Sequence, residues 1–140
     1  MWFGVARRPF AFASPVDGEF ALLLVVVADD VTDEEQSELS QQFVRAGCRY
    51  AVCFGPTSSS WDDSIDMVSV MDRVDGRDPP FVMTSWHDDE SVDEAVAFFA
   101  QHSRIDDELP RDFVVFMLGG TDRECAEVRE AVTRQFGWIG

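Results

Sequence analysis

The chain has 140 residues, of which 27 are acidic and 11 are basic, so its formal net charge is −16 at pH 7. This charge repels phosphate backbones and excludes direct binding to DNA or RNA as the main activity. All of the basic residues are arginine, which excludes enzymes that depend on a P-loop lysine or a Schiff-base lysine.

The first 19 residues differ from the rest of the chain. They interleave aromatic side chains with Arg7, Arg8 and Pro9, and the segment carries no net charge. We expect an N-terminal arm over residues 1–19, or an edge strand that lies over a sheet. Hydrophobic residues make up 46% of the chain, enough to fill one core, so residues 20–140 are expected to form a single α/β domain.

Four apolar runs are expected to be strands, and they cover residues 20–27, 50–54, 81–86 and 113–118. The first and last of these runs show no alternation of polar and apolar residues. Such strands are buried on both faces, as in a parallel sheet that helices cover on both sides.

Each apolar run is followed by an amphipathic stretch. Three of these stretches open with a capping box, Ser or Thr followed three residues later by Glu, and the boxes begin at Thr32, Ser91 and Thr121. The remaining helix is expected to begin within residues 58–63. The pattern predicts a three-layer Rossmann-like domain with a mostly parallel four-stranded sheet in the order 2-1-3-4.

The cysteines and the hydropathy of the chain indicate in which cellular compartment the protein is expected. The three cysteines, Cys48, Cys53 and Cys125, show no metal-binding or redox spacing and are typical of reduced, packed thiols. The longest apolar run, Phe20–Ala28, is about half of the roughly 20 residues that a membrane helix needs. We expect a cytoplasmic protein with no membrane partner.

Acidic side chains follow the first and third expected strands. In the order 2-1-3-4 these strands are neighbours, so Asp29 and Asp30 would lie beside His87 and Asp88 at the carboxyl edge of the sheet. Carboxylate oxygens with one imidazole suit Mg²⁺ or Mn²⁺, so these four residues are a candidate metal site. Acidic residues are also common at helix N-termini, because the helix dipole stabilises negative charge there. If this is the reason for these acidic residues, the chain holds no cofactor.

A second group of candidates lies near the start of the second helix and at the end of the third strand. Asp62, Asp63 and His87 are candidates for acid or base catalysis. Trp61, Trp86 and Asp89 are further candidates, because the two indoles could form an aromatic wall beside the acidic edge or could pack between the sheet and a helix.

Three segments carry a resemblance to a known family: residues 47–50, 60–66 and 81–91. They resemble a family of small bacterial proteins described only as a domain of unknown function. The Trp-Asp-Asp and Thr-x-Trp-His-Asp elements are the most specific parts. The resemblance marks six positions as typical of the family and implies no activity; they are Trp61, Asp62, Asp63, Trp86, His87 and Asp88.

Two functional hypotheses follow from the sequence. The first is a non-enzymatic binding or regulatory module whose acidic surface engages a protein partner, such as a basic protein. The alternative is a metal-dependent hydrolase or phosphoryl-transfer enzyme that uses the candidate metal site, with Asp62 or Asp63 as the base.

Overall fold

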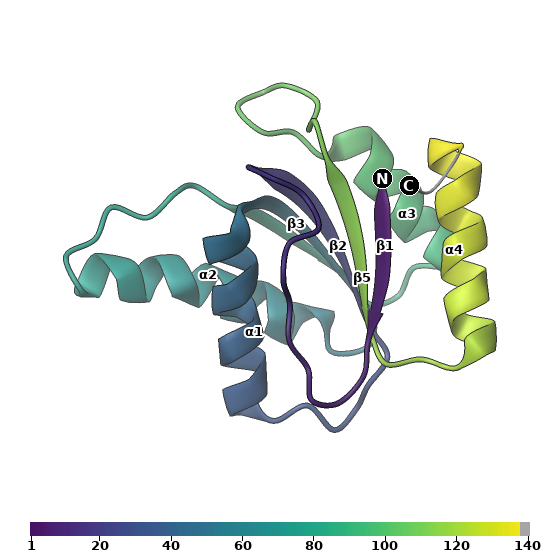
Figure 1. Cartoon of the computed structure of the whole chain (residues 1–140), viewed down its shortest axis with the longest axis horizontal. Coiled ribbons are helices and arrows are strands. Elements are labelled where there is room, and N and C mark those ends of the chain that lie inside the picture. Colours follow the sequence, from purple (N-terminus) through teal and green to yellow (C-terminus); the bar gives the residue numbers. More distant parts are fainter. Residues whose placement is uncertain (138–140) are drawn as a thin grey trace.

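One parallel sheet of five strands forms the centre of the molecule (Figure 1). The computed structural model describes residues 1–137. The strands lie in the order β1-β5-β2-β3-β4 and are all paired in parallel. Their bounds are β1 (Trp2–Ala6), β2 (Phe20–Val26), β3 (Cys48–Phe54), β4 (Met83–His87) and β5 (Phe113–Leu118).

Helices cover both faces of this sheet. Helices α1 and α2 lie on one face, and α3 and α4 lie on the other (Figure 1). The three predicted capping boxes are confirmed, with Thr32, Ser91 and Thr121 accepting from the backbone N–H three residues later. The helices are α1 (Asp33–Ala46), α2 (Ser58–Val74), α3 (Val92–His102) and α4 (Asp122–Phe136).

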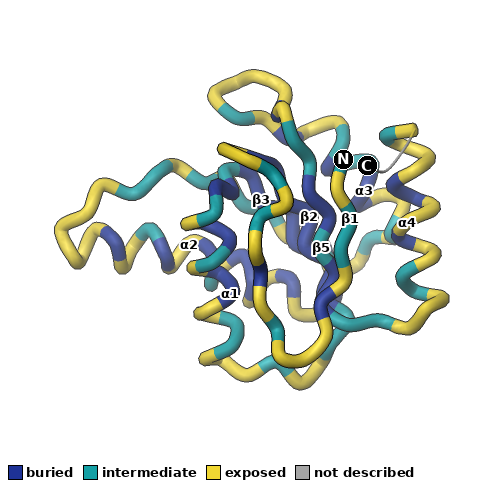
Figure 2. The backbone as a smooth tube through the Cα atoms, viewed as in Figure 1, coloured by how far each residue is buried: buried dark blue, intermediate teal, exposed yellow. Residues whose placement is uncertain are grey.

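The core consists of two apolar layers, one on each face of the sheet. Every residue of β2 is buried, as the continuous apolar run predicts (Figure 2). On the α1–α2 face, β-strand residues pack against Phe43, Trp61 and Ile65. On the α3–α4 face they pack against Phe99 and Val132. Among residues 1–137, no helix is long and apolar enough to cross a membrane.

The predicted α/β class and parallel sheet are confirmed, but two details of the predicted sheet are wrong. The sheet has five strands, not four, because residues Trp2–Ala6 pair with β5; of the two alternatives for the N-terminal segment, the edge strand is the one confirmed. The order 2-1-3-4 is also wrong: counted by the four expected runs, the order is 4-1-2-3. Both orders place the most apolar run in the interior of the sheet, so the hydropathy of that run does not distinguish them.

Candidate functional site

The residues of the predicted metal site follow strands that are not neighbours. Asp29 and Asp30 come after β2, whereas His87 and Asp88 lie at the end of β4, and β3 runs between these two strands. In the part of the chain that the structure describes, no group of three or more His, Cys, Asp or Glu side chains could hold a metal ion. The arrangement that the sequence led us to expect therefore depended on the wrong strand order.

Asp30 is engaged by a cation of the protein itself. Arg8 Nε lies 3.2 Å from Asp30 Oδ2, and Arg8 Nη1 lies 2.6 Å from Glu35 Oε2. The hydrogen bond from Arg8 lowers the pKa of Glu35, and the same bond is the main cause that raises the pKa of Arg8. These contacts tie the segment after β1 to the start of α1. Asp29 lies beside them and lines a hollow of about 200 Å³.

His87 is the middle residue of a hydrogen-bonded chain that runs from Ser85 through His87 to Glu90. Its Nδ1 lies 2.7 Å from Glu90 Oε2, and its Nε2 lies 3.1 Å from Ser85 Oγ. The imidazole is buried and packs on Phe98 of α3, with 4.5 Å between the ring centroids. With Nδ1–H donating to Glu90, Nε2 is free to accept the proton of the Ser85 hydroxyl.

Side chains of β4 alternate between the two faces of the sheet. Thr84 and Trp86 lie in register with Ala51 and Cys53, whose side chains belong to the core layer on the α1–α2 face. His87 points to the opposite face, toward α3. Strand alternation therefore separates His87 from the candidates on α2, because consecutive side chains of a strand point to opposite sides.

The three candidate catalytic residues are consequently not brought together. Asp62 is buried on the α2 side, Asp63 is exposed on α2, and His87 lies on the α3 side. The aromatic candidates also separate. Trp61 is 1% exposed and belongs to the core, whereas Trp86 is 50% exposed. The remaining candidates, Asp88 and Asp89, are exposed just after β4.

Asp62 and Asp66 share one hydroxyl group. Thr84 Oγ1 lies 3.0 Å from Asp62 Oδ1 and 3.1 Å from Asp66 Oδ1, and a hydroxyl has a single proton to donate. Burial raises the pKa of Asp62, and the neighbouring charge of Asp66 adds to this rise. The contact also joins the Trp-Asp-Asp element to the Thr-x-Trp-His-Asp element, so the two most specific parts of the family resemblance meet in space.

Asp62→Asn is expected to stabilise the protein at pH 7. A raised pKa in the folded state means that the ionised carboxylate opposes folding, and this penalty disappears as the pH falls below the pKa of the unfolded chain, about 3.9. Thermal melts from pH 7 to pH 3 should show the largest increase in melting temperature of the variant over the wild type at pH 7, and equal melting temperatures at pH 3. The exposed neighbour provides the control: Asp63→Asn should give no such pattern.

Exposed apolar side chains are concentrated in one part of the chain, from the middle of α2 to the end of β4. Seven of the ten large hydrophobic side chains that are exposed in residues 1–137 belong to residues 67–86. Val74 and Phe81 are the most exposed of them, at 73% and 76%. We call this set the α2–β4 surface; its members are Met67, Val70, Met71, Val74, Phe81, Met83 and Trp86.

The C-terminal half of α2 projects beyond the sheet (Figure 1). The helical spacing of Met71 from Trp61, Ile65 and Val68 predicts that all four side chains are buried, but Met71 is exposed. The helix has left the sheet by this point, so little remains for its last two turns to pack against. These turns consequently present apolar side chains to solvent.

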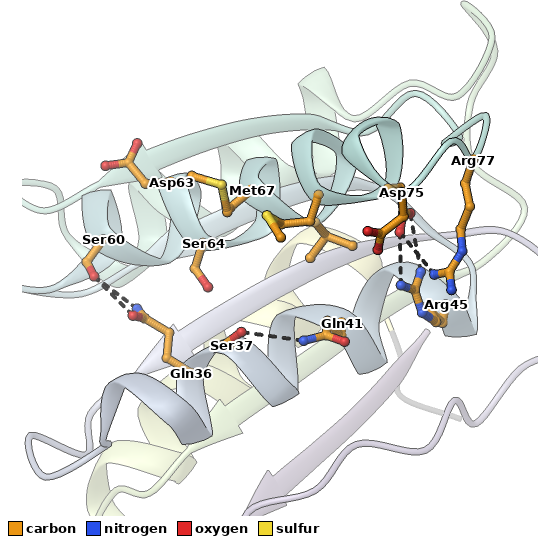
Figure 3. Close-up of a pocket in the computed structure, with 13 residues that line it drawn as sticks. Gln36, Ser37, Gln41, Arg45, Ser60, Asp63, Ser64, Met67, Asp75 and Arg77 are labelled. Carbon is orange, nitrogen blue, oxygen red and sulfur yellow. Dashed lines mark hydrogen bonds and ion pairs between the residues drawn. The ribbon is translucent and has the colours of Figure 1, made fainter.

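A groove of about 660 Å³ separates α1 from α2 (Figure 3). Gln36 of α1 bonds Ser60 of α2 at one end, with 3.0 Å between Nε2 and Oγ. Asp72 closes the other end, where Arg45 Nη2 lies 3.0 Å and Arg77 Nη1 lies 3.4 Å from its Oδ1. Met67 and Met71 of the α2–β4 surface also line this groove, so the surface continues into it.

Asp72→Asn is expected to destabilise the protein at neutral pH. The hydrogen bond from Arg45 lowers the pKa of Asp72 below that of the unfolded chain. A carboxylate whose pKa is lowered by folding stabilises the folded state above about pH 4. This contribution is lost as the pH falls through the pKa of Asp72 in the folded protein. Chemical denaturation from pH 7 to pH 2.5 should show a lower free energy of unfolding for the variant at pH 7 and a gap to the wild type that closes as the pH falls. Asp78→Asn, at an exposed carboxylate, is the control and should leave no gap.

Sequence reasoning missed several residues of this region. Ser85 and Glu90 were not candidates, although strand alternation places Ser85 on the face of His87. Asp66 follows Asp62 by four residues on a helix, a spacing that puts both carboxylates on one side. Thr84 and Asp72 have no comparable local signal, because their partners come from distant parts of the chain.

The chain was compared with known proteins. Residues 8–135 match the model of one protein family, described as Domain of unknown function (DUF7684). No match is found among curated proteins. The matched range includes both elements on which the resemblance rests, and it extends over the four helices to Gln135, one residue before the end of α4.

Proposed function

The chain belongs to the DUF7684 family, a domain of unknown function, and we propose that it acts by binding a partner protein through the α2–β4 surface. The concentration of exposed apolar side chains within residues 67–86 carries this proposal. Isolated exposed hydrophobic residues are ordinary, whereas many of them in one part of a protein favour a site of protein interaction.

The composition of the surface supports a protein ligand. Large aromatic and methionine side chains such as Phe81, Trp86 and Met83 are enriched in the cores of protein interfaces. Methionines adapt their shape to a partner because their side chains are unbranched. The groove next to the surface, with Met67 and Met71 along its length, would accept side chains of the partner.

The charge of the chain supports a basic partner. A net charge of −16 steers a cationic protein toward the surface and repels other acidic proteins. Association is therefore expected to be fast at low ionic strength and slower as salt is added, because screening weakens long-range attraction.

Photo-crosslinking in cells tests this proposal. A photo-reactive amino acid is placed at position 74, which is 73% exposed on the surface, or at position 109, which is 67% exposed outside it. We expect a protein adduct from position 74 that is absent or at least fivefold weaker from position 109. The adducted protein is then identified, purified and titrated against the chain.

The control and the contradicting result come from the same pair of positions. Leu109 is as apolar and nearly as exposed as Val74, so non-specific capture should mark both equally. Equal adducts at the two positions, or none at position 74, would contradict binding through the α2–β4 surface.

A second candidate function is hydrolysis with Ser85 as the nucleophile. The chain of hydrogen bonds from Ser85 through His87 to Glu90 favours it, because a hydroxyl, a base and a group that orients the base occur in that order. In such a step the Ser85 oxygen would attack an ester carbonyl, His87 Nε2 would pass the proton to the departing alcohol, and water would release the acid.

Covalent labelling tests this second candidate. A fluorophosphonate probe should add to Ser85 in the wild type, and Ser85→Ala and His87→Gln should both abolish the adduct while Ser91→Ala retains it. Mass spectrometry of the labelled peptide locates the adduct. If wild type and Ser85→Ala label to the same extent, Ser85 is not a nucleophile, and the hydrogen bonds serve only to order the end of β4.

A further inference from the structure

We infer that the partner presents an extended segment with a basic side chain, and that this segment adds to the free edge of β4 as a sixth strand of the sheet. This inference rests on the proposed function and specifies how the partner binds. Addition of a strand to an exposed sheet edge is a recurrent mode of peptide recognition, in which main-chain hydrogen bonds supply much of the affinity.

The backbone of β4 has one free side. Among residues 1–137, β4 is the last strand of the sheet and pairs only with β3. The carbonyl of His87 accepts from the N–H of Gly55, which follows β3, so the polar groups of His87 and of Ser85 point toward β3. Because successive residues of a parallel strand point their N–H and C=O groups to opposite sides, those of Thr84 and Trp86 point outward.

Within the five residues of β4 there is no proline, no lysine or carboxylate, and no bulge to block pairing. Natural edges are usually blocked by proline, by charged side chains or by a bulge. β4 has the sequence Met-Thr-Ser-Trp-His and pairs with β3 without a shift of register. Met83 and Trp86 are exposed, and their side chains can pack on those of an added strand.

Two carboxylates beside the edge select a basic side chain. Asp62 and Asp66 meet at the Thr84 hydroxyl, and neither forms an ion pair within residues 1–137. Arg73 lies on the same helix but seven residues beyond Asp66, about 10 Å along its axis. A lysine or arginine opposite Thr84 in the added strand would place its charge between the two carboxylates.

The other edge of the sheet does not offer the same chemistry. β1 is also an edge strand, but Arg129 lies over the Phe3 ring at 4.6 Å from its centroid, and Arg7 follows the strand. A basic segment would meet like charge there. A second copy of the chain is a poor occupant of the β4 edge, because each copy brings a net charge of −16.

Ten-residue peptides of stated sequence test the inference. The probe is a fluorescent peptide of alternating lysine and valine, compared with a glutamate–valine peptide and with a lysine–valine peptide that is N-methylated at alternate residues. N-methylation leaves the charge unchanged but removes the N–H groups of one edge. We expect the unmodified lysine peptide to bind at least tenfold more tightly than either of the others, as measured by fluorescence anisotropy.

Two proline variants test the site on the protein. Trp86→Pro removes an outward N–H, a change that an edge strand tolerates, and it is compared with Trp86→Ala to separate the loss of the indole. We expect Trp86→Pro to bind the lysine peptide at least tenfold more weakly than Trp86→Ala. Val5→Pro is the matched control, because Ala6 accepts from Gly119 and the N–H of Val5 therefore also points outward, at the opposite edge. It should leave binding unchanged.

The charge of the site is tested separately. The double variant Asp62→Asn with Asp66→Asn should bind the lysine peptide at least fivefold more weakly and with a smaller dependence on salt. Circular dichroism confirms that each variant remains folded.

Three results would overturn strand addition: equal binding of the methylated peptide, equal binding by Trp86→Pro and Trp86→Ala, or no measurable binding of the lysine peptide at millimolar concentration. A specific crosslink from position 74 together with any of these results would leave the proposed function intact. Equal crosslinks from positions 74 and 109 would count against the proposed function whichever peptide binds.

Discussion

Trp61→Ala is expected to lower the free energy of unfolding by about 3 to 5 kcal/mol, the range observed when a large buried aromatic side chain is removed. Trp61 is 1% exposed and packs in the layer between α2 and the sheet, in the same cluster as Ile65 and Cys53. The truncation leaves a cavity where the first turns of α2 meet the sheet. Urea denaturation measures the change, and the melting temperature should fall by about 10 °C or more.

Trp86→Ala is the matched control for this prediction. Trp86 is 50% exposed, so its truncation should change the free energy of unfolding by about 0.5 kcal/mol or less. The two variants remove the same side chain from positions that lie 25 residues apart in the sequence. Comparable losses of stability would show that Trp61 does not act as a core residue.

Gly55→Ala is expected to destabilise the protein by about 3 kcal/mol or more, through strain added to a steric clash. Gly55 has φ 129°, and a Cβ at this position would lie 2.4 Å from the carbonyl oxygen of Val26. The clash would push the turn before α2 away from the end of β2. The same turn donates the Gly55 N–H to His87, so β4 should also loosen.

Gly76→Ala separates strain from clash. Gly76 has φ 78°, also in the left-handed region, but a Cβ there would meet nothing within 4 Å. Its cost is expected to be the conformational penalty alone, about 1 to 2 kcal/mol. Denaturation curves of both variants in the same buffer give the difference, which is assigned to the contact with Val26. If both variants lose the same free energy of unfolding, the turn at Gly55 avoids the clash with Val26 by moving, without a further loss of stability.

Helix starts and buried strands could be predicted from the sequence because their causes are local. The capping boxes at Thr32, Ser91 and Thr121 lie where the chain itself places a hydroxyl and a carboxylate three residues apart. The continuous apolar run of β2 requires burial on both faces, which indicates a parallel sheet between helices. The family resemblance was also visible in short motifs, and the match to residues 8–135 confirms it.

The order of the strands was decided only by tertiary structure. The pairing of β5 with β2 joins residues that lie about 90 positions apart, and no local pattern encodes such a choice. The predicted metal site depended on that order, since Asp30 and His87 would be close only if their strands were neighbours. Binding of Mg²⁺ or Mn²⁺ therefore stays a prediction, but the four residues proposed as ligands do not follow neighbouring strands.

The sequence by itself determined the α/β class, the starts of three helices, the net charge and the family resemblance. It could not tell that Trp61 lies in the core while Trp86 lies at a free sheet edge, because both indoles occur in similar acidic surroundings. Burial depends on which elements cover a side chain. That β4 lies at the edge, with one side of its backbone unpaired, follows from the packing of the whole chain.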